Sequence, residues 1–304
     1  MKLTLILFIG LFSWSTNAQT IDFFEVADQF MKRHCSAGKV DYLAAKSDKS
    51  LKRLTEFIAH NDLPTGGEKA YLVNVYNLLV INKIIQLYPI GSPMSDAEFF
   101  TGKTSILNGE KISLDQLEND IIRVQYPDPR NHFVLVCGAL GCPPIQNFAY
   151  TPKKLEEQME AQATEALNNS VFVYQDDASK TIYLSEIFSW YENDFGDSKK
   201  AVVTYINSYR SAPFNLSYKV KSHPYDWALN DIAIKSEEPN DGTFSGITTQ
   251  TNLQQFTAGS LLANGKSDIT LFNSLYTETH QIWKGTEYSG YRTSFMTHLV
   301  TQLK

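Results

Sequence analysis

The chain has 304 residues, of which 43% are apolar and 20% are charged, and its formal net charge is −6. This composition excludes a wholly disordered chain and a collagen, and three cysteines are too few for a disulfide-stabilised miniprotein. The sequence contains no basic run of the kind that follows a phosphate backbone, so we expect no nucleic-acid partner.

Residues 1–18 have the pattern of a secretory signal peptide. Lys2 gives a short positive region, residues 3–12 are almost continuously apolar, and small residues precede a cleavage position after Ala18. The apolar run is too short to span a bilayer, which takes about 20 residues, although a retained anchor helix is the alternative. We therefore expect an exported protein, periplasmic or extracellular, that is soluble after cleavage. Such compartments favour disulfide formation.

Apolar spacing predicts the first helices of the mature chain. Residues 21–35 and 48–60 each place their apolar side chains on one face. Residues 68–88 are apolar on nearly all sides, which predicts a central helix buried by the others. Ser113, with Gln116 three positions later, has the spacing of a capping box and predicts a further helix.

The next elements are shorter. A valine-rich run at residues 132–136, followed by Gly138, predicts a buried strand. The remaining predictions are helices over residues 151–169, 185–195 and 198–210, a hairpin of residues 171–175 and 180–184, and a strand over residues 216–221. Together these elements predict a helix-rich α+β main domain with a small sheet over residues 19–234.

Composition changes after residue 234. Residues 235–246 are charged and contain proline and glycine, which is typical of a linker. Residues 247–304 are rich in Thr, Ser and Gln and alternate enough in part to predict a β-prone C-terminal extension. A partly disordered tail is the alternative. This extension is our candidate for contact with a cell-envelope partner.

Two carboxamides stand out on the apolar central helix. Asn74 and Asn77 are three residues apart and therefore share a face. Each needs hydrogen-bond partners, because a buried unpaired polar group costs about 1–3 kcal/mol. They either hold neighbouring backbone in place or line a polar pocket.

Cys142 is the candidate nucleophile. It lies in a short glycine-containing loop after the valine-rich run, where a thiol of lowered pKa would become reactive. Alternatively, Cys137 is a buried apolar side chain, or the two cysteines form a disulfide. On a straight strand His132 and Cys137 are about 16 Å apart, so His132 reaches Cys142 only if the loop folds back. Glu118, on the preceding helix, could partner Cys142 without the loop folding back.

The chain resembles a widespread uncharacterised family, domain of unknown function 547, over about residues 25–232. The resemblance rests on the blocks AYLVNVYNLLVI, ILNGEKISLDQLENDIIR, DPRNHFVLVCGALGCPPI, LSEIFSWYENDF and YDWALN, which occur in that order. It implies that the signature positions are Asn74, Asn77, Glu118, Arg123, His132, Cys137 and Cys142. The family brings no established activity.

Three functional hypotheses follow. The first is a cysteine-dependent hydrolase or acyl-transfer enzyme, in which Cys142 attacks an acyl carbon, His132 takes the proton and Glu118 orients the base. Asn74, Asn77 and Arg123 would then bind the substrate, an unidentified small molecule or peptide. The second is a non-catalytic exported binding module with a Cys137–Cys142 disulfide. The third, a metal site, lacks an identifiable fourth ligand, so we predict no metal and no cofactor.

Overall fold

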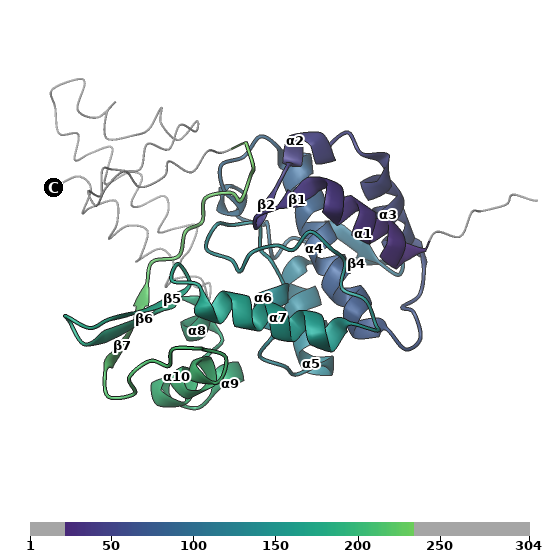
Figure 1. Ribbon diagram of the computed structural model, residues 1–304. Coiled ribbons are helices and arrows are strands. Elements are labelled where there is room, and N and C mark those ends of the chain that lie inside the picture. The colour runs from purple at the N-terminus through teal and green to yellow at the C-terminus, as the bar shows by residue number, and fades with distance from the viewer. Residues whose placement is uncertain (1–21, 234–304) are drawn as a thin grey trace, which may run out of the picture.

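The computed structural model describes residues 22–233 (Figure 1). The predicted signal peptide, linker and C-terminal extension lie outside these residues. The helices are α1 Phe23–His34, α2 Tyr42–Ala45, α3 Lys49–His60, α4 Glu68–Leu87, η1 Pro93–Ser95, the π-helix η2 Gln116–Ile122, α5 Arg123–Gln125, α6 Asn131–Val134, α7 Leu155–Asn168, α8 Ile187–Trp190, α9 Glu192–Phe195 and α10 Lys199–Ser208. The strands are β1 Cys35–Ser36, β2 Lys39–Val40, β3 Ser105–Leu107, β4 Glu110–Ile112, β5 Val173–Asp176, β6 Thr181–Ser185 and β7 Lys219–His223. The expected helix-rich α+β class is confirmed.

The first hydrophobic core is built around α4. This helix is long and apolar enough to cross a membrane by length and composition, but 83% of its most apolar window is buried inside the protein, as in the core helix of a globular domain. Helices α1 and α3 pack beside it, and each begins at an aspartate, Asp22 or Asp48, whose carboxylate accepts a hydrogen bond from the first turn. The predicted central helix is therefore confirmed.

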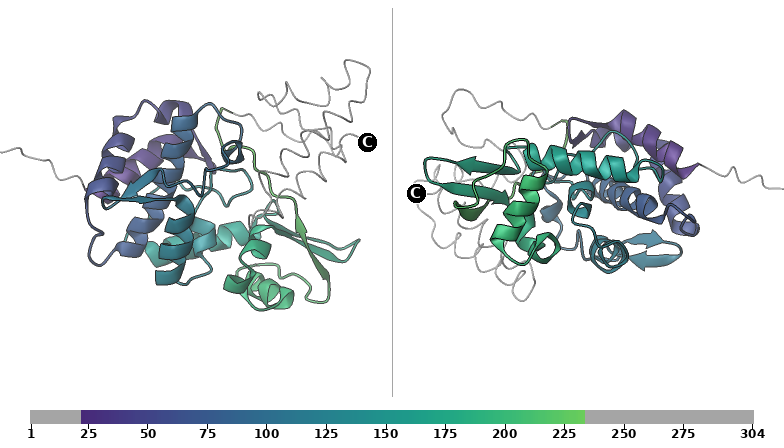
Figure 2. Two further views of the ribbon diagram at one scale, coloured as in Figure 1. Left: turned by 180° about the vertical axis from the view of Figure 1, so that it is seen from behind. Right: turned by 60° about the horizontal axis from the view of Figure 1, so that its bottom comes forward.

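A second hydrophobic core lies under the three-stranded sheet. Strands β5 and β6 form the predicted antiparallel hairpin, and β7 pairs with β6 in parallel, so the strand order is β5-β6-β7. Helices α8, α9 and α10 gather beside this sheet, and α7 runs from it towards the α4 side (Figures 1 and 2). Cys142 packs against both cores, which places the predicted reactive loop where they meet.

One predicted element is wrong. The valine-rich segment is not a strand, because residues 131–134 form the single helical turn α6. The turn is closed by backbone hydrogen bonds from Phe133 to Arg130 and from Leu135 to Asn131, both 3.0 Å long. A short apolar run that is buried on all sides has no period that separates strand from helix, and here all four residues are buried. The 16 Å separation expected for a straight strand therefore does not apply.

Two predicted helices have altered form. The helix capped by Ser113 does receive the capping-box contacts, since the Gln116 backbone N–H donates to the Ser113 hydroxyl at 3.0 Å, but its central turns are the π-helix η2. The predicted helix over residues 185–195 is divided into α8 and α9 at Tyr191. Both irregular segments contribute side chains to the candidate site.

Candidate functional site

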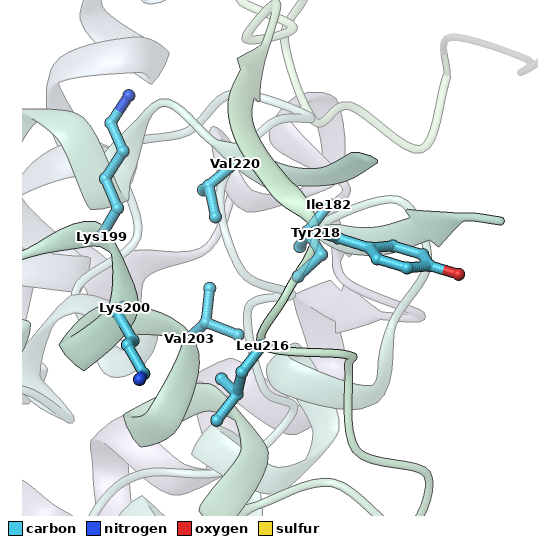
Figure 3. A pocket seen from close by; sticks show the side chains of 7 residues that line it. All are labelled: Ile182, Lys199, Lys200, Val203, Leu216, Tyr218 and Val220. Atoms are coloured by element: carbon cyan, nitrogen blue, oxygen red, sulfur yellow. The ribbon is translucent and has the colours of Figure 1, made fainter. Parts of the chain in front are cut away.

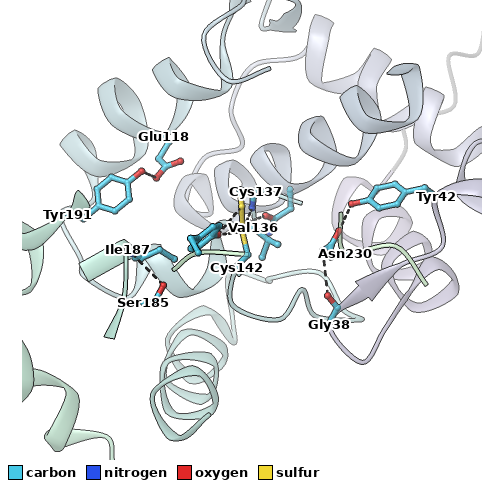
Figure 4. Close-up of a disulfide and its surroundings, with 12 residues drawn as sticks. Gly38, Tyr42, Glu118, Val136, Cys137, Cys142, Ser185, Ile187, Tyr191 and Asn230 are labelled. Carbon is cyan, nitrogen blue, oxygen red and sulfur yellow. Dashed lines mark hydrogen bonds between the residues drawn. A yellow bond between two sulfur atoms is a disulfide. The ribbon is translucent and has the colours of Figure 1, made fainter. Parts of the chain in front are cut away.

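A disulfide occupies the predicted reactive loop. Cys137 and Cys142 are bonded to each other, with their Cα atoms 6.3 Å apart (Figure 4). The loop between them needs glycine at two places. Gly138 has a φ of +85°. A Cβ at Gly141 would lie 2.9 Å from the backbone nitrogen of Asp226, and the Gly141 N–H donates to the Asp226 carbonyl at 2.8 Å. The backbone of Asp226 therefore holds in place the loop that carries the two sulfur atoms.

Tyr225 is the polar group beside both sulfurs. Its hydroxyl donates to the Cys142 Sγ at 3.0 Å and lies 3.1 Å from the Cys137 Sγ. Its ring packs against Trp190 and Trp227, with centroids 4.9 and 4.7 Å apart, and those two indoles stack on each other at 5.8 Å. Both tryptophans are half-buried. The disulfide is thus bordered by an aromatic cluster that reaches the surface.

His132 belongs to a separate ion-pair cluster. Its Nε2 lies 2.7 Å from Asp194 Oδ2, and the same oxygen accepts from the Arg123 Nε at 2.8 Å. The imidazole side chain is only 2% exposed and stacks on the Tyr191 ring, with centroids 4.0 Å apart. The hydrogen bond from His132, followed by the pairing with Arg123, lowers the pKa of Asp194. Asp194 is therefore a fixed anion that orients the imidazole.

Glu118 joins this cluster through Tyr191. The Tyr191 hydroxyl donates to Glu118 Oε1 at 2.9 Å (Figure 4), and the Arg123 guanidinium lies over the Tyr191 ring at 4.7 Å. Burial of Tyr76, on α4, and then the charge of Glu118 raise the pKa of the Tyr76 hydroxyl. Glu118 lies on the π-helix, a helix type that is frequent at functional sites.

The structure brings three of the predicted site residues into one network. Glu118, Arg123 and His132 meet through Tyr191 and Asp194. Cys142 contacts Tyr225, and His132 Nε2 is held by Asp194. The expected pairing of imidazole with thiol is thus replaced, in this disulfide form, by two neighbouring clusters.

The two predicted carboxamides hold backbone. Asn74 donates to the Tyr150 carbonyl at 2.7 Å and accepts from the Tyr150 N–H at 2.9 Å. Asn77 does the same for the segment before the disulfide, donating to the Val134 carbonyl and accepting from the Val136 N–H, both at 2.9 Å. This is the backbone-holding role that the sequence analysis set against a polar pocket. Substrate binding by Asn74 and Asn77 stays a prediction.

The sequence analysis gave no site role to three residues of these clusters. Tyr191 and Asp194 lie in the aromatic block at residues 184–195, and Tyr225 begins the block at residues 225–230. Each carries a polar group among apolar neighbours, which was the available signal of a site. Their hydrogen-bond partners could not be identified from the sequence because they are distant along the chain. Within residues 22–233 no group of three or more His, Cys, Asp or Glu side chains is arranged to hold a metal ion.

Comparison with protein families supports the resemblance. Residues 61–166 match the family described as "Protein of unknown function, DUF547". That range includes Glu118, His132 and Cys142, whereas the blocks at residues 184–195 and 225–230 lie outside it. Neither the curated proteins nor the solved structures contained a match. Residues 61–166 are therefore similar to DUF547, which is the family that the sequence motifs indicated.

Proposed function

We propose that this protein is an exported, non-catalytic binding module whose site is organised by the Cys137–Cys142 disulfide. The observation that carries the proposal is the disulfide itself, because the nucleophile of a cysteine enzyme is a thiolate and neither of these sulfurs is one. Export is inferred from residues 1–18, and an oxidising compartment preserves such a bond.

The aromatic cluster beside the disulfide is the proposed binding surface. Trp190 and Trp227 are half-buried, and Phe100 extends the cluster, with its ring centroid 6.3 Å from that of Trp227. Ligand sites typically combine aromatic side chains with a few placed polar groups, here the acidic Asp226 beside Trp227. The ligand class that fits is a small molecule or a short peptide able to stack on an indole.

Saturation-transfer NMR with a pool of random-sequence tripeptides tests this surface on the full mature chain. We expect transfer to bound peptides in the wild type and its loss in Trp227→Ala. Tyr174→Ala is the matched control, because Tyr174 is an exposed aromatic on the sheet whose ring contacts Tyr183 and His223 rather than this cluster. Equal transfer in all three proteins, or none in the wild type, would refute the proposed surface.

A second candidate is the thiol enzyme, which one observation favours. The Tyr225 hydroxyl donates to Cys142 Sγ, and a hydrogen bond of this kind stabilises a thiolate. A dithiol reductant would convert the disulfide into two thiols while itself becoming a disulfide. The Cys142 thiolate would then attack an acyl carbon and expel the alcohol or amine, which leaves with a proton from His132 or Tyr225. Water would release the acid and restore the thiol.

Hydrolysis of 4-nitrophenyl acetate separates the two candidates. The binding module predicts no turnover above that of Cys142→Ala, with or without dithiothreitol. The enzyme predicts turnover in Cys137→Ser without any reductant, because that change frees Cys142, and its loss in Cys137→Ser/His132→Gln. Reductant-dependent turnover that requires both Cys142 and His132 would overturn the non-catalytic proposal.

A further inference from the structure

A hollow separates the first turns of α10 from the sheet. It has a volume of about 230 Å³ and lies between Val203 of α10, Ile182 of β6 and Val220 of β7 (Figure 3). Val203 and Ile182 are almost wholly buried and form its floor, whereas Leu216 is 46% exposed at its edge. Tyr218 and two lysines complete the lining, so the hollow has an aliphatic floor and polar groups in its walls.

A smaller hollow of about 30 Å³ continues the first one. The two share Lys199 and Val220, and the second extends along β7 to Ser222 and across to Ser189 of α8. The result is one groove between helix and strand, and Lys199 stands where its two parts meet. The volume lies below the roughly 300–1,000 Å³ of sites for drug-sized ligands, so the groove suits a smaller, elongated molecule.

The rim of the groove is cationic. Lys199, Lys200 and Lys221 line it, and Glu192 is its only carboxylate among the described residues. Figure 3 shows Lys199 and Lys200 on the same side of the hollow with their side chains running in opposite directions, that of Lys200 towards the Leu216 end. The chain as a whole has a net charge of −6, so this excess of ammonium groups is a local feature.

We propose that this groove binds an aliphatic monocarboxylate of short to medium length. The aliphatic floor takes the hydrocarbon chain out of water, and the Lys199 ammonium pairs with the carboxylate at the junction of the two hollows. Lysine side chains on flexible stems suit a single anionic group that can lie at more than one position. The groove involves neither the disulfide nor the aromatic cluster, so this proposal does not depend on the function proposed above.

Isothermal titration of the full mature chain with sodium octanoate tests this inference. Octan-1-ol and octylamine, which have the same chain length, and acetate, which lacks the chain, are the comparison ligands. We expect saturable octanoate binding that is weaker for octan-1-ol and absent for octylamine and acetate. Octylamine binding as tight as octanoate binding would overturn the proposal, since it would indicate unspecific adsorption of an alkyl chain.

Three variants locate the site. Lys199→Gln should weaken octanoate binding up to about fivefold, as expected for the loss of one solvent-exposed ion pair. Lys219→Gln is the matched control, because Lys219 is exposed on the same strand but does not line the groove, and its affinity should equal that of the wild type. Leu216→Trp should block the larger hollow and abolish binding without lowering the melting temperature, since Leu216 is exposed. Unchanged octanoate affinity in both Lys199→Gln and Leu216→Trp would refute the site.

Discussion

Replacing Asn77 by leucine tests whether the carboxamides on α4 have a structural role. The side chain is 2% exposed, and its two hydrogen bonds hold the backbone of Val134 and Val136 just before the disulfide. Leucine has a similar volume but no polar atoms, so it leaves one buried carbonyl and one buried N–H unpaired. At about 1–3 kcal/mol for each group, the free energy of unfolding should fall by about 2–6 kcal/mol.

Urea unfolding followed by tryptophan fluorescence measures this loss. With a urea m-value of about 3 kcal/mol/M, the midpoint should fall by about 0.7–2 M. Asn61→Ala is the control, because Asn61 is exposed and bonds only to the Phe57 carbonyl at the end of α3, so its midpoint should change by less than about 0.3 M. If Asn77→Leu unfolds at the same urea concentration as the wild type, the backbone-holding role is refuted and a binding role for Asn77 gains support.

Three further predictions concern thiols and charge. Maleimide should label no cysteine in the native chain at pH 8 and only Cys35 after unfolding without reductant. Burial raises the pKa of Cys35 to about 12, and the other two sulfurs are bonded to each other. Labelling of Cys142 in the native, unreduced protein would contradict this prediction. Replacing Cys137 and Cys142 together by serine should cost about 2 kcal/mol of unfolding free energy, the loop-entropy value for so short a ring, as measured by calorimetry. The pKa of Asp194 is lowered in the folded state, so its stabilising contribution is present above the ordinary aspartate pKa of about 3.9 and is lost as the pH falls towards its lower native value. Asp194→Asn should therefore lose stability at neutral pH and flatten the decline in acid, and an unchanged pH profile would show that the ion pair contributes nothing.

The sequence by itself determined most of the helical framework. Residues 68–88 were predicted as a buried central helix, and Glu68–Leu87 form α4. A helix that is apolar on all sides is stable in water only when other elements cover it on every side. The capping residue Ser113 indicated the start of a further helix, and its hydroxyl does accept a hydrogen bond from the Gln116 backbone N–H. The sequence motifs also indicated the family whose model matches residues 61–166, a shorter range than the predicted residues 25–232.

Only the tertiary structure decided which groups meet. The turn at residues 131–134 is helical rather than extended because every side of it is buried, a condition that no local pattern expresses. The partner of His132 is Asp194, and the partner of Cys142 is Cys137 with Tyr225 above both sulfurs. These pairings join segments far apart along the chain or depend on how a loop folds back, so they follow from the packing of the two cores and not from residue spacing.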